Sequence, residues 1–269
     1  SLMNLVQASK VISANTERLY QKKSAAFQYL SVNLSKRINV SFFQGLIWRA
    51  GDDKNRQHLG WQFFNPLIYS NLFTYGLNHR NNIVAGADLK IRLLKTLNVY
   101  GQLMADRIYT GATDNLWGYQ AGINYYDVFG IKNLSFQCEL NRVAENSYSS
   151  PVNETSQAYF HYNQHLAYTP GAGNELLLFA DYRYKRFFLN IRTGFRERQF
   201  EDNNKAMDQH VTNVNGSLGY LINPSYNLNI SAGVNYRKQN FRYFTSLNNE
   251  TNYIYLALRT SIYNLYYDF

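Results

Sequence analysis

The sequence lacks the cysteine pairs that form disulfides and the long apolar runs that form transmembrane helices. Cys138 is the single cysteine among 269 residues, and only four prolines are present. One cysteine cannot form an intramolecular disulfide, so a disulfide framework is excluded and Cys138 is interpreted as a small hydrophobic residue. No apolar run approaches the roughly 18 residues that a transmembrane helix needs, and the mean hydropathy is -0.42. A bilayer crossing by helices is therefore excluded.

Motifs of catalysis and of nucleic-acid binding are also missing. No Gly-rich phosphate loop occurs, and the basic residues behind the net charge of +9 are spread along the chain without a nucleic-acid motif. His161 and His165 have an i, i+4 spacing, but Tyr162 stands where a zinc-protease helix needs Glu. Nothing marks one serine as the nucleophile of an outer-membrane hydrolase. We predict a non-catalytic protein without cofactor, metal or nucleic-acid partner.

Long stretches of alternating apolar and polar residues dominate the chain instead. Between residues 83 and 107, Ala85, Ala87 and Leu89 share one predicted face, and Asp88, Lys90 and Arg92 share the other. The alternating runs extend over about 10–13 residues, whereas strands of soluble sandwiches average about 5–6. A tilted strand that crosses a bilayer needs the greater length.

The pattern predicts an all-β fold, a transmembrane antiparallel up-and-down β-barrel of about 12 strands, forming a single domain over residues 1–269. Short turns alternate in order with longer links, and the longest links lie near 50–82 and 143–173. Bacterial barrels have short periplasmic turns and longer extracellular loops. The predicted strands are 2–11, 24–34, 38–49, 83–93, 97–108, 115–126, 132–142, 174–184, 187–198, 211–222, 226–239 and 252–268.

The last residues, 263–269, form an amphipathic aromatic segment that ends on Phe269. Such a terminal strand is typical of outer-membrane barrels. We therefore expect an integral protein of the outer membrane of a Gram-negative bacterium, in contact with outer-membrane lipid and with its C-terminus in the periplasm. About twelve strands would close a small barrel, but because the alternation begins almost at Ser1, a larger barrel of which this chain is the C-terminal part is an equal alternative.

Basic residues gather on the predicted inner face of the barrel. A positive lumen would concentrate anions such as phosphate, lipopolysaccharide or acidic polysaccharide. Alternatively, the cations form ion pairs with Asp88, Glu139, Asp181 and Glu197 and fill a closed barrel. The predicted basic lumen residues are Lys90, Arg92, Arg183, Arg192, Arg196, Arg198 and Arg237.

The two long loops are the predicted ligand-binding regions, because binding residues concentrate on loops held by a rigid scaffold. Segment 60–82 is so apolar that it should fold into the barrel mouth or pack on a neighbour. Segment 157–173 combines aromatic faces with amides, which suits a sugar site; a plug held by its own hydrogen bonds is the alternative. The candidate glycan-binding residues are Trp61, Tyr69, Tyr148, Tyr159, His161, Tyr162, Asn163 and His165.

Several segments resemble the Wzi-type capsule-assembly outer-membrane β-barrel family, especially its gliding-motility (RemB-like) branch. They read NVSFFQGLIW, FFNPLIYSN, ELNRVAENSYS, YFHYNQHLAYTPG and the terminal YYDF. The resemblance implies an outer-membrane barrel and a lectin-like hold on capsular polysaccharide. Members are usually much longer, so the resemblance implies that this chain is their C-terminal portion.

The expected function is attachment or assembly of surface polysaccharide, or a part in surface adhesion and gliding. Two other classes stay open. One is a diffusion channel for small or anionic solutes, and the other is a structural subunit that binds further envelope proteins.

Overall fold

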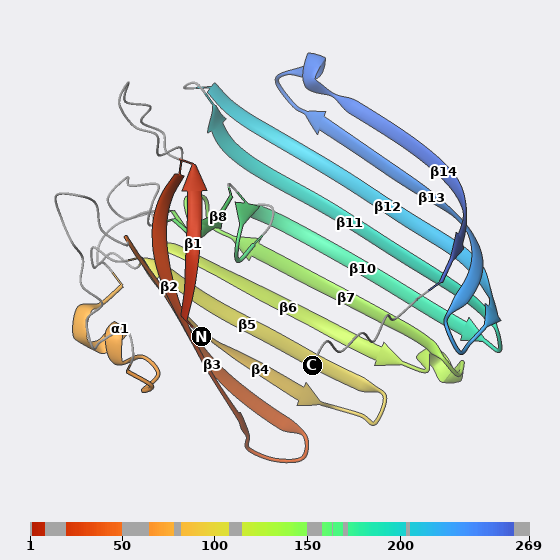
Figure 1. The fold of residues 1–269 in the computed structure, drawn as a ribbon, viewed down its shortest axis with the longest axis horizontal. Helices are drawn as coiled ribbons and strands as arrows, with labels where there is room; N and C mark the ends of the chain where they lie inside the picture. Colours follow the sequence, from red (N-terminus) through yellow and green to blue (C-terminus); the bar gives the residue numbers. More distant parts are fainter. Residues whose placement is uncertain are drawn as a thin grey trace, which may run out of the picture. The chain divides into compact units, whose positions relative to one another are not determined.

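The computed structural model describes residues 2–8, 20–49, 65–77, 82–107, 115–149, 158–162, 164–168, 172–202 and 205–260. Strands dominate these ranges, and neighbours in the sequence are neighbours in one large sheet (Figure 1). No helix in the described part is long and apolar enough to cross a membrane.

The large sheet has twelve strands in the order β1 to β7 and then β10 to β14, and all seven strand pairs of resolved register are antiparallel. The two-stranded hairpin β8–β9 is separate. The strands of the large sheet are β1 (Leu2–Ala8), β2 (Tyr20–Asn33), β3 (Ile38–Arg49), β4 (Asn82–Arg92), β5 (Leu97–Arg107), β6 (Leu116–Tyr126), β7 (Leu134–Val143), β10 (Gly173–Tyr184), β11 (Phe187–Asp202), β12 (Lys205–Asn223), β13 (Leu228–Phe241) and β14 (Asn249–Arg259). The small elements are α1 (Ser70–Tyr75), β8 (Phe160–His161), β9 (Gln164–His165) and the 3-10 helices η2 (Val128–Gly130) and η4 (Thr245–Leu247).

All twelve predicted strands are therefore present, which confirms the all-β antiparallel meander. Closure into a barrel is not seen, because within the described ranges β1 pairs only with β2 and β14 only with β13. The terminal aromatic segment 263–269 lies outside the described residues.

Short hairpins join the strands at one end, and their turns contain residues in the left-handed backbone region. Asn133, Lys185 and Asn227 have φ of 62°, 53° and 53°. Asn tolerates this conformation better than most residues, whereas Lys185 adopts it in the two-residue turn between β10 and β11. These turns fix the register of the strands that follow.

The chain divides into two compact units. Unit 1 comprises Ser1–Arg92, Tyr100–Ala121 and Asn141–Gly173; unit 2 comprises Leu93–Val99, Gly122–Leu140 and Asn174–Phe269. Strands β5, β6 and β7 contribute residues to both units. The prediction of a single domain stays a prediction.

Unit 2 has two chemically distinct faces, as the alternation predicts. Leu218 lies opposite Ala232, and Ala232 lies opposite Leu256, so one face carries an apolar row across three strands. The exposed fractions of Leu218 and Leu256 are 59% and 75%. We call this face the outer face and the opposite one the inner face. The outer face further includes Ile230, Val234, Ile254 and Leu258, all exposed.

In unit 1, each face of the sheet is covered by a loop segment. On one face, Tyr159 packs with Ile47, Val84 and Met104 in a buried cluster. On the other, Leu72 of α1 packs against the buried Leu46, Trp48 and Ile83. That second face carries Ala85 and Ala87, for which the sequence predicts lipid contact.

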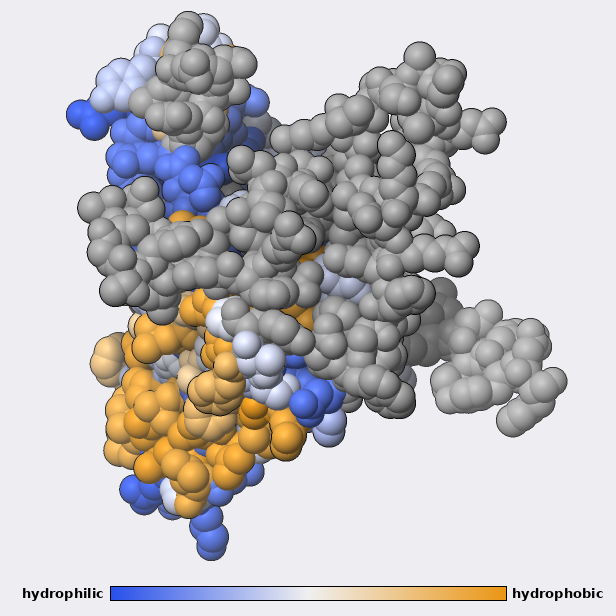
Figure 2. All heavy atoms as spheres, turned by 90° about the vertical axis from the view of Figure 1, so that its left-hand side faces the viewer, coloured by the Kyte–Doolittle hydropathy of each residue, from blue (hydrophilic) through white to orange (hydrophobic). Residues whose placement is uncertain are grey.

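Segment 65–77 packs on this second face of its own unit. The Tyr69 hydroxyl donates to the Gly86 carbonyl oxygen at 2.5 Å, and its ring meets Phe42 edge-on. The segment buries its own apolar side chains on the sheet, because removing them from water is favourable. Leu67 and Phe73 remain 69% and 84% exposed, and Figure 2 shows hydrophobic atoms gathered on the side of the molecule where α1 lies.

Three glycines lie directly across from aromatic residues of a neighbouring strand. The pairs are Gly86 with Phe43, Gly219 with Phe188, and Gly233 with Tyr255. In each pair a Cβ atom on the glycine would overlap the aromatic ring. The aromatic ring therefore occupies the space that the missing side chain leaves, as in the pairing that stabilises glycine in designed sheets.

Gly86→Ala is expected to destabilise the fold by about 1–3 kcal/mol, the usual cost of overpacking. The added methyl group meets the Leu103 backbone carbonyl as well as Phe43, so rotating one side chain cannot relieve the overlap. The matched control is Gly216→Ala, whose Cβ would lie 3.8 Å from a Val234 methyl group. Urea unfolding of both variants checks this; equal stabilities would contradict it.

Candidate functional site

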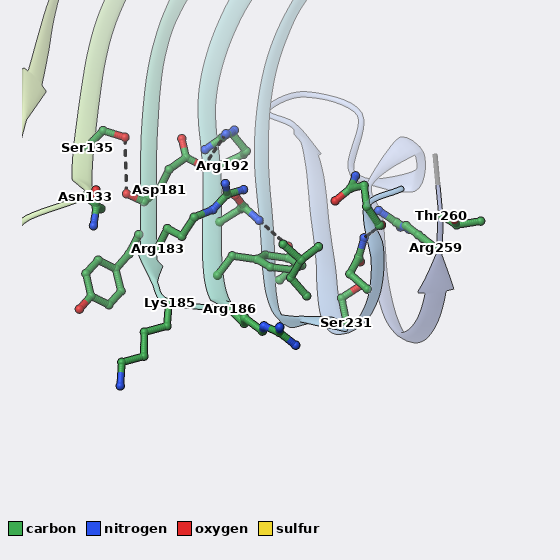
Figure 3. Close-up of a pocket in the computed structure, with 17 residues that line it drawn as sticks. Asn133, Ser135, Asp181, Arg183, Lys185, Arg186, Arg192, Ser231, Arg259 and Thr260 are labelled. Atoms are coloured by element: carbon green, nitrogen blue, oxygen red, sulfur yellow. Dashed lines mark hydrogen bonds and ion pairs between the residues drawn. The ribbon is translucent and has the colours of Figure 1, made fainter. Parts of the chain in front are cut away.

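A cavity of about 620 Å³ lies in unit 2 and is lined by five cationic side chains (Figure 3). They are Arg183, Lys185, Arg186, Arg192 and Arg259, and Asp181 is the one carboxylate among the lining residues. Amides and hydroxyls complete the wall, among them Asn133, Ser135, Asn190, Asn229, Ser231 and Thr260. We call this site the basic pocket.

The sheet register brings these residues together from distant parts of the chain. Arg183 of β10 lies opposite Phe188, which lies opposite Gly219 of β12. One step further, Asn229 of β13 lies opposite Arg259 of β14. Because side chains alternate between faces, one face of six strands, β7 and β10 to β14, forms the wall together with the adjoining turns. The basic pocket therefore lies on the inner face, at the end of unit 2 where the short turns 185–186 and 224–227 lie.

Arg192 and Asp181 form the ion pair of the basic pocket. Their Nη2 and Oδ1 atoms are 2.7 Å apart, and both side chains are about 40% exposed, at 41% and 39%. An exposed pair of this kind contributes about 0–1 kcal/mol to stability. The Arg192 guanidinium also lies over the Phe179 ring, 5.2 Å from its centroid. Stacking and pairing together fix its orientation.

The other four cations of the basic pocket have no carboxylate partner within the described ranges. The Arg186 guanidinium donates to the Ile222 carbonyl at 3.1 Å. The Lys185 ammonium lies over the Tyr184 ring, and the Arg259 guanidinium lies over the Tyr255 ring. With one carboxylate against five cations, the lining has an excess of four positive charges.

Such a site is suited to bind anions. Guanidinium groups bind carboxylate, sulfate and phosphate through paired, charge-assisted hydrogen bonds. The surrounding amides and hydroxyls are the partners that sugar hydroxyls use. No histidine or cysteine lines the basic pocket, so its lining residues offer binding chemistry rather than a nucleophile with an adjacent base.

The predicted basic lumen residues separate into two groups. Arg183 and Arg192 line the basic pocket, and the Arg192–Asp181 pair realises one of the predicted ion pairs. The others do not line it. Lys90 and Arg92 lie on β4, Arg198 lies on β11, Arg196 forms an ion pair with Glu175 at 2.9 Å, and Arg237 donates to Gln239 at 2.7 Å.

Sequence reasoning missed Lys185, Arg186 and Arg259 as members of the pocket. Lys185 and Arg186 were assigned to a short turn, where a charge is ordinarily solvated. The signal was nevertheless present, because a turn residue lies beside the ends of the strands that it joins. Arg259 is out of phase with the exposed apolar Ile254, Leu256 and Leu258 of its strand and therefore points to the inner face.

The predicted glycan-binding tyrosines differ strongly in exposure. Tyr159 is 3% exposed, and its hydroxyl donates to the Asn82 carbonyl at 3.2 Å. Its ring meets Tyr148 edge-on at 5.8 Å, and Tyr69 is partly buried on the other face of unit 1. Tyr159 is therefore buried in contacts within the protein, as expected for a plug, and its ring is not exposed to a sugar.

The remaining candidates are found in and beside the β8–β9 hairpin. Tyr162 is 58% exposed at its tip, beside the His161 ring at 4.5 Å, and His165 lies against Phe160 at 4.2 Å. They lie in unit 1, whereas the basic pocket is in unit 2. Trp61 and Asn163 lie outside the described residues.

Burial holds two of these phenols neutral at alkaline pH. Burial, reinforced by the nearby Asp106 charge, raises the pKa of Tyr148 to about 12 and that of Tyr159 well above its ordinary value. An unfolded tyrosine has a pKa of about 10. Since the folded pKa values are the higher ones, the linked stability is complete below pH 10, and the part due to Tyr148 is lost as pH rises through about 12.

We therefore expect two late-ionising tyrosines in an alkaline titration followed by tyrosinate absorbance. Tyr148→Phe and Tyr159→Phe should each remove part of the late component. A single transition near pH 10 in a protein that is still folded would contradict the buried environment.

A comparison of the chain with protein-family models finds no match, and neither does a comparison with curated proteins.

Proposed function

We propose that this chain is an integral outer-membrane β-barrel, or part of one, that binds an acidic surface polysaccharide without modifying it. The observation that carries the proposal is the two-faced sheet of unit 2. Its outer face exposes apolar side chains, and its inner face holds a basic pocket with an excess of positive charge.

The outer face supports the membrane part of the proposal. Ile254, Leu256 and Leu258 are 82%, 75% and 69% exposed on one strand. A contiguous apolar surface of this kind marks a partner or a membrane. Strands of 10 to 19 residues in β2–β7 and β10–β14 are long enough to cross a bilayer when tilted. Unpaired strand edges are costly in lipid, so closure of the sheet by its own or further strands is part of the proposal.

The basic pocket supports the ligand class. A polysaccharide with carboxylate, sulfate or phosphate groups offers anions for the guanidinium groups and hydroxyls for the amides. The basic pocket lies at the short-turn end of unit 2, which in a bacterial barrel faces the periplasm. A polymer would meet it on the way to the surface, so assembly fits better than attachment. Membership of the Wzi-type family, which the loop segments resemble, is a further part of this proposal.

The test is a binding titration of the detergent-folded protein. Polygalacturonate supplies a carboxylated chain, and dextran of similar length supplies a neutral one. The proposal expects saturable binding of polygalacturonate that weakens as salt increases, with no binding of dextran. The proposal would be refuted if the two polymers bound equally well, or if neither of them bound.

A diffusion channel for anionic solutes is the second candidate, because the same unpaired cations would attract small anions. The buried Tyr148–Tyr159 cluster in unit 1 argues for filled space instead. Planar-bilayer recordings separate the two candidates. An anion-selective conductance in the absence of polysaccharide would favour the channel.

A further inference from the structure

A second cluster of charged side chains lies at the far end of β11 and β12 from the basic pocket. It consists of Glu197, Asp208 and His210, and the ligand atoms of all three lie within 4.8 Å of one another. All three are in phase with Leu218 and therefore lie on the outer face, not on the inner face that holds the basic pocket, so the prediction of Glu197 as a lumen carboxylate is wrong. Two carboxylates and an imidazole are a donor set that divalent transition metals accept.

The strand register explains why these three side chains meet. Glu197 of β11 lies directly opposite His210 of β12, and Asp208 precedes His210 by two residues. Residues directly opposite and diagonal to each other on one face of an antiparallel pair are neighbours. The backbone ladder therefore holds the three Cα atoms in place without help from a loop, since the register is unbroken from Phe187 to Asp202.

Asp208 provides an independent sign of a ligand. The residue is 6% exposed, and its Oδ1 is buried without a hydrogen bond. The His210 Nε2 is 3.2 Å from that oxygen, but the contact is an ion pair only when the imidazole is protonated. A buried carboxylate oxygen without a donor is costly, and a cation between the three groups would remove the cost.

The second oxygen of Asp208 is held from the other side. Arg242 Nη1 lies 3.6 Å from Oδ2, and the Arg242 backbone N–H donates to the Asp208 carbonyl at 3.0 Å. These contacts leave Oδ1 directed at Glu197 and His210. The carboxylate is thereby oriented by Arg242 and offers one oxygen to the cluster.

We propose that Glu197, Asp208 and His210 bind one divalent transition-metal ion of the Zn²⁺ type. Ligand atoms around a tetrahedral Zn²⁺ at 2.0–2.2 Å are about 3.4 Å apart. The observed separations of up to 4.8 Å need small rotations of the exposed Glu197 and His210 side chains, with no backbone shift. Ca²⁺ fits less well, because it takes six to eight oxygen ligands and rarely imidazole. Water would complete the coordination.

Isothermal titration calorimetry of the full chain, folded in detergent, with ZnCl₂ tests the proposal. We expect one saturable site, weakened at least about tenfold by Glu197→Gln and by His210→Ala, since even loss of a group that only supports a ligand costs 10–100-fold. CaCl₂ should give no saturable heat. His161→Ala/His165→Ala is the matched control and should leave Zn²⁺ binding unchanged, because these histidines lie in unit 1.

A second measurement separates loss of the site from loss of the fold. Zn²⁺ should raise the thermal unfolding midpoint of the parent chain and of the control, and EDTA should reverse the rise. Glu197→Gln and His210→Ala should unfold at the midpoint of the metal-free parent and should not respond to Zn²⁺. Unchanged affinity in both variants, or an absence of saturable binding in the folded parent, would overturn the proposal.

Discussion

Val234→Arg is expected to destabilise the protein folded in lipid bilayers by about 2–4 kcal/mol. That is the cost of a lipid-facing Arg near the bilayer midplane. Val234 lies at the middle of β13 (Leu228–Phe241), between Gly216 of β12 and Ile254 of β14, and is 41% exposed. In the proposed barrel this position contacts acyl chains, so the guanidinium loses its hydration without gaining a partner.

The matched control is Asn235→Arg, one residue further along the same strand. Asn235 faces the inner side, where its amide contacts that of Asn215. We expect Asn235→Arg to destabilise the protein by less than about 1 kcal/mol, because the position is solvated and ordinary surface substitutions have effects of this size. Folding yield into vesicles, measured from the shift between folded and unfolded bands in electrophoresis, reports both variants. Equal losses would contradict the assignment of the two faces.

Arg183→Gln combined with Arg259→Gln is expected to weaken binding of polygalacturonate by on the order of 100-fold. Each hydrogen bond to a charged group contributes about 1.5–3 kcal/mol, and 1.4 kcal/mol is a factor of ten. Both guanidinium groups line the basic pocket without a carboxylate partner in the described ranges. Their removal should therefore affect binding far more than folding.

Two other cations provide the control for charge alone. Lys90→Gln with Arg237→Gln removes the same net charge at positions that do not line the basic pocket. Polygalacturonate affinity measured at fixed ionic strength should fall less than about threefold, the effect of screened distant charges. If both double variants lose affinity equally, general attraction by the net charge of +9 explains the binding.

The strands could be predicted because a period of two is a strong signal where one face is apolar. In β13, Leu228, Ile230 and Ala232 alternate with Asn229 and Ser231, and the structure places them on opposite faces as the alternation requires. A slip of one residue would exchange the faces. The alternation does not mark where a strand ends, and β11 and β12 extend several residues beyond their predicted bounds.

The small elements could not be predicted, because nothing periodic marks them. The six residues of α1 contain two apolar residues, Leu72 and Phe73, too few for a helical pattern. Tyr69, before the helix, has φ of 64°, which a tyrosine rarely adopts. The helix therefore depends on tertiary packing of Leu72 against Leu46 and Trp48. Local propensity carries no information about such a contact.

Only part of the basic pocket could be predicted, because alternation assigns a residue to a face but gives no information about tertiary contacts. Face assignment identified Arg183 and Arg192, because both continue an alternation. It could not show that Tyr159 would be buried at 3% exposure, since that depends on how residues 158–168 return to the sheet. The cluster of Glu197, Asp208 and His210 depends on the register between two strands, which the sequence alone leaves open.

A spin-label scan along β13 in lipid vesicles shows whether the outer face of unit 2 lies in the bilayer. Cys138 is the single cysteine, so Cys138→Ala gives a background into which one cysteine is introduced at each position from 229 to 237. In a membrane-embedded sheet, nitroxides at positions 230, 232, 234 and 236 should collide mainly with oxygen, which dissolves in lipid. Labels at the intervening positions should collide mainly with a water-soluble nickel chelate. Equal nickel access on both faces of a folded, vesicle-associated protein would contradict a membrane-embedded sheet.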